Sequence, residues 1–200
     1  MQIETLNQLR SLYATPKERA VKKQIDHLDV HCRRFIALSP FVVIASGNGV
    51  AMDASPRGGA PGFIKTPDAH TLLIPDAPGN NRLDTLENIV SQAQLGLFFM
   101  IPGVDETLRV NGTAVLANDD ALLDLCANER RRPALVICVS VAAAYLHGAK
   151  ALLRSRLWHA DAQVDRACLP SAGEMISDQT GIIIAPETQE AMRARYAPEL

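Results

Sequence analysis

A turn rich in polar groups precedes a candidate helix in the stretch "IPDAPGNNRLDTLENIV" (residues 74–90). A helix that begins after Pro78-Gly79, capped by Asn80 or Asn81, would expose free backbone N–H groups beside Arg82. The helix dipole, the backbone donors and a guanidinium together suit a phosphate. This turn therefore predicts an anion site, and the open alternative is an ordinary capped helix with a solvated arginine.

A second stretch, "MDASPRGGAPGFIK" (residues 52–65), contains two further cations. Its notable positions are Asp53, Ser55, Arg57, Gly58, Gly59, Gly62 and Lys65. Alternation places the first three on one face of a strand end, and the glycines allow the backbone to approach a ligand closely. Each of these cations, considered singly, is typical of a solvated surface residue. Convergence of Arg57, Lys65 and Arg82 from consecutive elements would instead bind an anion.

The third stretch is "HGAKALLRSRLW" (residues 147–158). On a helix, its residues His147, Lys150, Arg154 and Trp158 would form one stripe at steps of three and four. Such a stripe can wall a planar anionic ligand. The alternative is a solvated face that ends in a favourable basic turn.

The elements that position these groups are mainly β-strands. Helical periodicity covers 4–13 and 17–38, and strand-like runs cover 41–46, 49–55, 62–65, 70–76, 95–102, 107–116 and 134–146. Further helices are expected after Asn80, at 121–126 and at 143–158, followed by a strand at 181–186 and a terminal helix. The short spacing favours an antiparallel barrel or sandwich. At Asn111-Gly112 we favour a bulge in one strand over a hairpin turn.

Composition excludes several classes of protein. The 20 Lys and Arg nearly balance 22 Asp and Glu, so no nucleic-acid partner is expected. Apolar runs fall short of the roughly 20 residues of a membrane helix, and the first residues lack signal-peptide features; we therefore expect a cytoplasmic protein that does not bind membranes. Four scattered cysteines without a CxxC pair predict free, mostly buried thiols and no metal site.

The order of "DASPRGGAPGFIK", "LLIPDAPGNNRLDTLENI", "LFFMIPGVDETLRVNGTAVL" and "KALLRSRLW" resembles the FMN-binding split-barrel proteins related to pyridoxamine 5'-phosphate oxidase. The resemblance is closest to their poorly characterised flavin-nucleotide-binding branch, and it covers 41–158. It implies a mainly β (α+β) fold, a six-stranded antiparallel split barrel that forms a homodimer with FMN at the subunit interface. We expect one domain over 1–200, with an N-terminal helical segment (1–40), the barrel core (41–158) and a C-terminal extension (159–200).

The resemblance also implies a cofactor-binding set: Ser55, Arg57, Gly58, Lys65, Asn80, Asn81, Arg82, Thr107, Lys150, Arg154 and Trp158. Lys65 and Arg82 match phosphate-binding cations. Asn81 lies where the oxidases usually have a basic residue, and Thr107 lies near an amide that contacts the flavin ring. Ser55, Arg57 and Gly58 would lie near the ring or the ribityl chain. Lys150, Arg154 and Trp158 would come from the dimer partner or cover the flavin.

The function expected from this resemblance is an FMN-dependent oxidoreductase acting on an unknown small substrate. Arg57 or Arg154 would stabilise the reduced flavin. The alternative is a non-catalytic module that binds or senses flavin nucleotides; a structural protein with a vestigial pocket, or a different flat ligand such as a deazaflavin, also stays open. The chain lacks the C-terminal arginine- and histidine-containing motif of the oxidases, so pyridoxamine oxidation is not implied.

Overall fold

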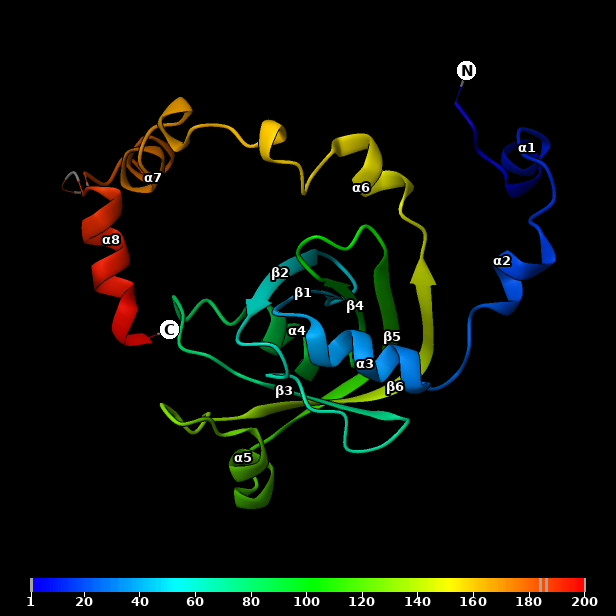
Figure 1. The fold of residues 1–200 in the computed structure, drawn as a ribbon, viewed down its shortest axis with the longest axis horizontal. Helices are drawn as coiled ribbons and strands as arrows, with labels where there is room; N and C mark the ends of the chain where they lie inside the picture. Colours follow the sequence, from blue (N-terminus) through cyan, green and yellow to red (C-terminus); the bar gives the residue numbers. More distant parts are fainter. Residues whose placement is uncertain (1, 184, 186, 200) are drawn as a thin grey trace.

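Six antiparallel strands form one curled sheet, a split barrel, in the order β2-β1-β4-β5-β6-β3 (Figure 1). The structure is a computed structural model and describes residues 2–183, 185 and 187–199. The strands are β1 (Phe41–Gly47), β2 (Met52–Gly58), β3 (Thr71–Pro75), β4 (Gln94–Met100), β5 (Thr107–Ala117) and β6 (Val136–His147). The predicted six-stranded antiparallel split barrel is confirmed.

Alternation along the strands gives the sheet an inner and an outer face. On the inner face, Val42, Ile44, Leu97, Phe99 and Val110 are buried in the core. Two helices cover this face, α3 (Val30–Leu38) and α4 (Asp84–Ser91), and both contribute to the same apolar cluster. The outer face carries the intervening residues of the strands, which are only half-buried in β1 and β4.

The remaining helices lie outside this core. They are α1 (Leu6–Ser11), α2 (Glu18–Lys22), α5 (Asp120–Cys126), α6 (Lys150–Ser155), α7 (Ala172–Thr180) and α8 (Gln189–Tyr196). Of these, only α5 contains buried residues. Figure 1 shows the two terminal segments leaving the barrel as separate arms, α1 and α2 on one side and α7 and α8 on the other.

The predicted helix over 17–38 is two helices, α2 and α3. Between them, Ile25 forms an antiparallel bridge with Ala144 of β6, through hydrogen bonds of 3.0 and 2.7 Å. The backbone N–H of Leu28 donates to the carbonyl of Ala69 (2.7 Å). The spacing of apolar residues continues through this segment because Ile25 and Leu28 still pack on the core. Their backbone hydrogen bonds, however, go to other segments and interrupt the helix.

The predicted helix over 143–158 is wrong for most of its length. Residues from Ala143 to His147 pair with β5, so β6 continues where the helix was expected. The helix α6 covers only Lys150–Ser155 and ends at Arg156 in the left-handed conformation (φ 54°). Non-local pairing with β5 therefore overrides the local helical spacing.

Two other predicted strands also differ. At 62–65 only Lys65 pairs, as an isolated bridge with Leu73. At 181–186, Gly181 caps α7 in the left-handed region (φ 72°), and Ile182 and Ile183 are not in a strand. The rest of that prediction includes Ile184 and Pro186, which lie outside the described residues. The terminal helix is confirmed as α8.

The bulge at Asn111-Gly112 is confirmed. β5 is one continuous strand whose register against β6 shifts between these two residues. A Cβ atom at Gly112 would lie 2.0 Å from the backbone oxygen of Ser140, so only glycine fits this close approach.

The four cysteines are free thiols, as predicted. Cys32 and Cys126 are buried, Cys138 is half-buried and Cys168 is exposed. None of the helices in the described part of the chain is long and apolar enough to cross a membrane.

Candidate functional site

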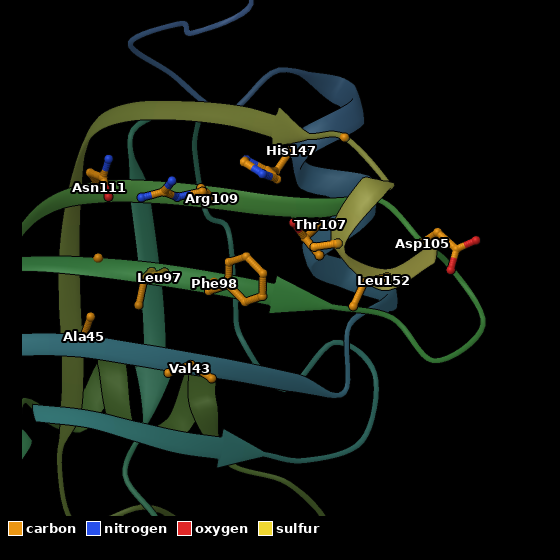
Figure 2. Close-up of a pocket in the computed structure, with 13 residues that line it drawn as sticks. Val43, Ala45, Leu97, Phe98, Asp105, Thr107, Arg109, Asn111, His147 and Leu152 are labelled. Atoms are coloured by element: carbon orange, nitrogen blue, oxygen red, sulfur yellow. The ribbon is translucent and has the colours of Figure 1, made fainter. Parts of the chain in front are cut away.

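The outer face of the sheet contains a cavity of about 290 Å³ beneath α6 (Figure 2). Its polar lining includes Thr107, Arg109, Asn111 and His147, and its apolar lining includes Val43, Ala45, Phe98 and Leu152. The cavity lies opposite the helices that cover the core, because its strand residues alternate with the buried ones. The half-exposed apolar floor and the polar row beside it suit a flat ligand with polar edges.

Strand β5 supplies the polar row. Thr107, Arg109 and Asn111 occupy alternate positions and therefore point to the same face. Asn111 pairs with Gly96 of β4. A Cβ atom added at Gly96 would lie 3.2 Å from the Asn111 Oδ1 atom. Glycine at this position leaves room for the amide.

Thr107 is the clearest sign of a ligand in this cavity. It is 3% exposed, and its Oγ1 atom has no hydrogen-bond partner among the described residues. Leaving a buried hydroxyl unpaired costs about 1–3 kcal/mol, and such groups are uncommon in folded proteins. Thr107 is one of the residues that line the cavity, so a ligand bound there would lie beside this unpaired hydroxyl. The unpaired hydroxyl therefore marks this cavity as a candidate ligand site.

Arg109 brings a positive charge to the same cavity. Its guanidinium lies 5.3 Å from the ring centroid of Tyr145, the residue opposite it on β6. The ammonium of Lys23 lies 5.7 Å from the same ring and donates to the carbonyl of Leu146 (2.7 Å). Two cations therefore lie against the Tyr145 ring, and one of them, Arg109, lines the cavity.

A second cavity of about 530 Å³ adjoins the first. The two share Ala45, Gly96 and Asn111. The second cavity has an uncharged lining that includes Gln92 and Gln94. Together they extend the candidate site along the outer face, from α6 toward the β1–β2 connection.

The predicted polar face of β2 lies on the other side of the sheet. Ser55 and Arg57 stand opposite the buried Ile44 and Val42 of β1, so they share the inner face. Asp53, on this same face, accepts hydrogen bonds from the hydroxyls of Ser55 and Thr85, both 2.8 Å long. These bonds join the edge strand to the start of α4. Gly58 ends the strand and is exposed.

The start of α4 differs from the prediction. The helix begins at Asp84 and its N-cap is Leu83, in the left-handed conformation (φ 61°), so neither Asn80 nor Asn81 caps it. The Asn80 side chain accepts instead from the backbone N–H of Arg82 (3.1 Å), and Asn81 also has a positive φ of 59°. The two left-handed residues move the helix start beyond the asparagines.

Arg82 is held beside this helix start by an ion pair. Its Nε atom lies 2.9 Å from the Asp84 Oδ2 atom, and the arginine side chain is 73% exposed. The hydrogen bond that the guanidinium donates to Asp84 raises the pKa of Arg82 above its usual value. Arg82 thus lies at the surface with a single carboxylate partner.

Lys65 is not brought to Arg82 within one chain. Its ammonium donates to the Gly62 carbonyl (2.9 Å). Among the described residues no hydrogen bond or ion pair joins Lys65 with Arg82, and neither lines the two cavities above. The convergence of the three cations on one ligand stays a prediction.

The predicted stripe after residue 147 does not form. His147 ends β6, whereas Lys150 and Arg154 lie exposed on α6. Trp158 follows the helix, and its indole N–H donates to the Val104 carbonyl (2.9 Å). The left-handed Arg156 separates the tryptophan from the helix, so the four residues share no helical face.

The predicted site residues therefore fall into two main groups. The inner group surrounds β2 and the start of α4, and the outer group has Thr107 in the cavity with α6 above it. Sequence reasoning missed Arg109 and Asn111, and it placed His147 on a helical stripe, whereas His147 lines the cavity from the end of β6. The alternation in "ETLRVNG" was a usable signal for the first two, since it places them on the same strand face as Thr107.

Comparison with known proteins decides the family. The profile described as pyridoxamine 5'-phosphate oxidase matches residues 28–154, more than half of the chain. The chain belongs to the pyridoxamine 5'-phosphate oxidase family. The matched region of this family includes all six strands, the cavity and the start of α4. The resemblance inferred from the sequence motifs is confirmed.

Several solved structures are similar to this member of the pyridoxamine 5'-phosphate oxidase family. HupZ of Group A Streptococcus is 13% identical (TM-score 0.48), and the match covers 59% of this chain and 92% of HupZ. General stress protein 26 of Bacillus anthracis is 12% identical (TM-score 0.44), covering 58% and 94% of the two chains. An FMN-binding protein of Syntrophomonas wolfei is 8% identical (TM-score 0.45), covering 58% and 83%. A search of curated proteins found no match.

Proposed function

We propose that this protein is a homodimeric flavoprotein that binds FMN at the subunit interface and acts as an FMN-dependent oxidoreductase on a small substrate. The observation that carries the proposal is the buried, unpartnered hydroxyl of Thr107 in the outer-face cavity. The family resemblance puts Thr107 near a position at which the oxidases have an amide side chain in contact with the flavin ring. Family membership supports the nucleotide, and the orphan hydroxyl supports a ligand at that point.

The division of the predicted residues between two faces supports a dimer. Arg57 lies on the inner face at the edge of the sheet and Thr107 lies on the outer face, so the sheet separates them within one chain. One ligand can contact both groups when the edge of one copy lies against the outer face of another. The half-buried apolar residues Val43 and Phe98 on that face suit such an interface.

In this arrangement each group has a distinct task. Arg82 at the start of α4 binds the phosphate and exchanges Asp84 for this stronger anion, and Lys65 is the second cation that the family resemblance assigns to the phosphate. Thr107 and Asn111 position the ring, and α6 shields it from water. The flavin, when bound, supplies the transfer of electrons or hydride.

Purified protein tests the proposal directly. We expect the visible absorption of bound flavin, or its appearance when apoprotein is titrated with FMN, and bleaching by NAD(P)H or another reductant. Protein that takes up no FMN overturns the proposal. Uptake of FMN without turnover, over a panel of reductants and acceptors, would identify the non-catalytic binding or sensing module instead.

The oligomeric state is tested separately. Analytical ultracentrifugation of the FMN-loaded protein should give about twice the chain mass of 21.7 kDa. A stable monomer with bound FMN would contradict the interface site while leaving flavin binding intact.

A further inference from the structure

We propose that Arg109 is the residue that stabilises the negative charge of reduced FMN, and that Tyr145 holds its guanidinium in place for this role. The inference rests on the proposed function, because it takes the outer-face cavity as the site of the flavin ring. It names a residue that neither the sequence motifs nor the family resemblance assigned.

The position of Arg109 aims it at the cavity. It lies on β5 between Thr107 and Asn111, with all three on the outer face (Figure 2). Its neighbours across the sheet are Phe98 on β4 and Tyr145 on β6. The aromatic ring of Tyr145, 5.3 Å from the guanidinium carbon, restricts where the cation can lie.

The donors of Arg109 are free. Among the described residues, this half-buried guanidinium has no hydrogen-bond or ion-pair partner, and its one close contact of this kind is with the Tyr145 ring. Other arginines proposed for the site differ, since Arg82 pairs with Asp84 and Arg57 donates to the Pro56 carbonyl. An arginine carries five N–H donors in a planar fork, so Arg109 can bind an acceptor edge of a flat ligand.

The charge of Arg109 has little compensation nearby. Asp105, the carboxylate of the cavity lining, lies on the connection before β5 and points away from Arg109 in Figure 2. Lys23 adds a second positive charge on the Tyr145 ring. The cavity therefore favours a ligand state with negative charge.

Reduced and oxidised flavin differ in the charge that the ring carries. The oxidised ring is neutral, and uptake of two electrons and one proton leaves one negative charge on the ring. A half-buried cation acts in a lower effective dielectric than water, so Arg109 stabilises the reduced form more than the oxidised form. Within one chain, neither Arg57 nor Arg154, the two candidates expected from the sequence, lines this cavity, whereas Arg109 does.

The test compares Arg109→Met with Arg109→Lys in the FMN-loaded protein. Reductive titration with dithionite against a reference dye measures the midpoint potential, and fluorescence titration measures affinity for oxidised FMN. We expect Arg109→Met to lower the affinity ratio of reduced to oxidised FMN by about tenfold, the worth of a charged hydrogen bond. For a two-electron couple this equals a fall of about 30 mV. Arg109→Lys should restore most of the potential.

The control is Arg34→Met, which removes an exposed arginine from α3 on the opposite face of the sheet. Its potential should equal that of the wild type. If Arg109→Met folds poorly in thermal melts, Tyr145→Leu serves as the second variant, because it keeps the charge and removes the ring that orients it. An intermediate fall in potential is then expected.

The outcomes separate the two proposals. Wild-type protein that does not bind FMN overturns the proposed function together with this inference. FMN that binds, with the same potential in the wild type as in Arg109→Met and Tyr145→Leu, overturns the role of Arg109 alone.

Discussion

Arg109 and Tyr145 stand directly opposite each other on β5 and β6, and the guanidinium lies over the tyrosine ring at 5.3 Å. The register between β5 and β6 produces this contact. The same register puts Thr107 opposite His147 at the end of β6. The bulge at Asn111-Gly112 changes the register beyond these pairs. The cavity is thus organised by strand pairing, and four predictions follow from its surroundings and from the fold that supports it.

Arg82→Ala should weaken FMN binding. Loss of a charged hydrogen bond to the phosphate costs about 1.5–3 kcal/mol, or roughly 10- to 150-fold in affinity. Fluorescence titration of apoprotein with FMN measures this, and Arg34→Ala on α3 serves as the matched arginine control. Equal affinity in the wild type and Arg82→Ala would show that the phosphate lies elsewhere.

Thr107→Val should weaken FMN binding without destabilising the apoprotein. The variant removes a buried hydroxyl that has no hydrogen-bond partner among the described residues, so the free energy of unfolding of the apoprotein should stay the same or rise by up to about 1 kcal/mol. Affinity for FMN should fall, because the ligand loses a hydrogen-bond partner. Urea unfolding and FMN titration measure the two effects, and unchanged FMN affinity would contradict the proposed ring contact.

Gly112→Ala should destabilise the sheet. The new methyl group would lie 2.0 Å from the backbone oxygen of Ser140, and relief of such overpacking costs about 1–3 kcal/mol or more. Gly79→Ala is the control, since nothing lies within 4 Å of a Cβ atom there. Thermal unfolding that left both variants equal to the wild type would argue against the close approach at the bulge.

Asp29 should make stability depend on acid pH. Its carboxylate caps α3 by accepting from the Cys32 N–H (2.7 Å), and this hydrogen bond lowers its pKa below the usual 3.8. A lowered pKa in the folded state contributes stability above the unfolded value, and that contribution is lost as the pH falls through the folded value. Asp29→Ala should cost about 1 kcal/mol at neutral pH.

Asp29→Asn separates the cap from the titration. Asparagine is also a good N-cap, so this variant should keep most of the neutral-pH stability. As the pH falls below about 4, Asp29→Asn should lose less stability than the wild type. The difference in the free energy of unfolding should equal the contribution of this one carboxylate. Identical acid profiles for the two proteins would assign the acid sensitivity to other groups.

Strand content and the bulge were predictable because they depend on local alternation and on one glycine. Runs such as the one that became β1 alternate between buried and half-buried residues, and this period is written in the chain. The 17–38 helix failed because Ile25 uses its backbone to pair with Ala144, far away in the sequence. The expected 143–158 helix failed for the same reason, since β6 gains its hydrogen bonds from β5.

By itself, the sequence determined the family, the antiparallel strands and the alternation that places Thr107, Arg109 and Asn111 on one strand face. Only the tertiary structure decided that this face lines a cavity while Ser55 and Arg57 lie on the opposite face. The physical reason is that alternation defines two faces of a strand, but packing against α3 and α4 selects which one is buried.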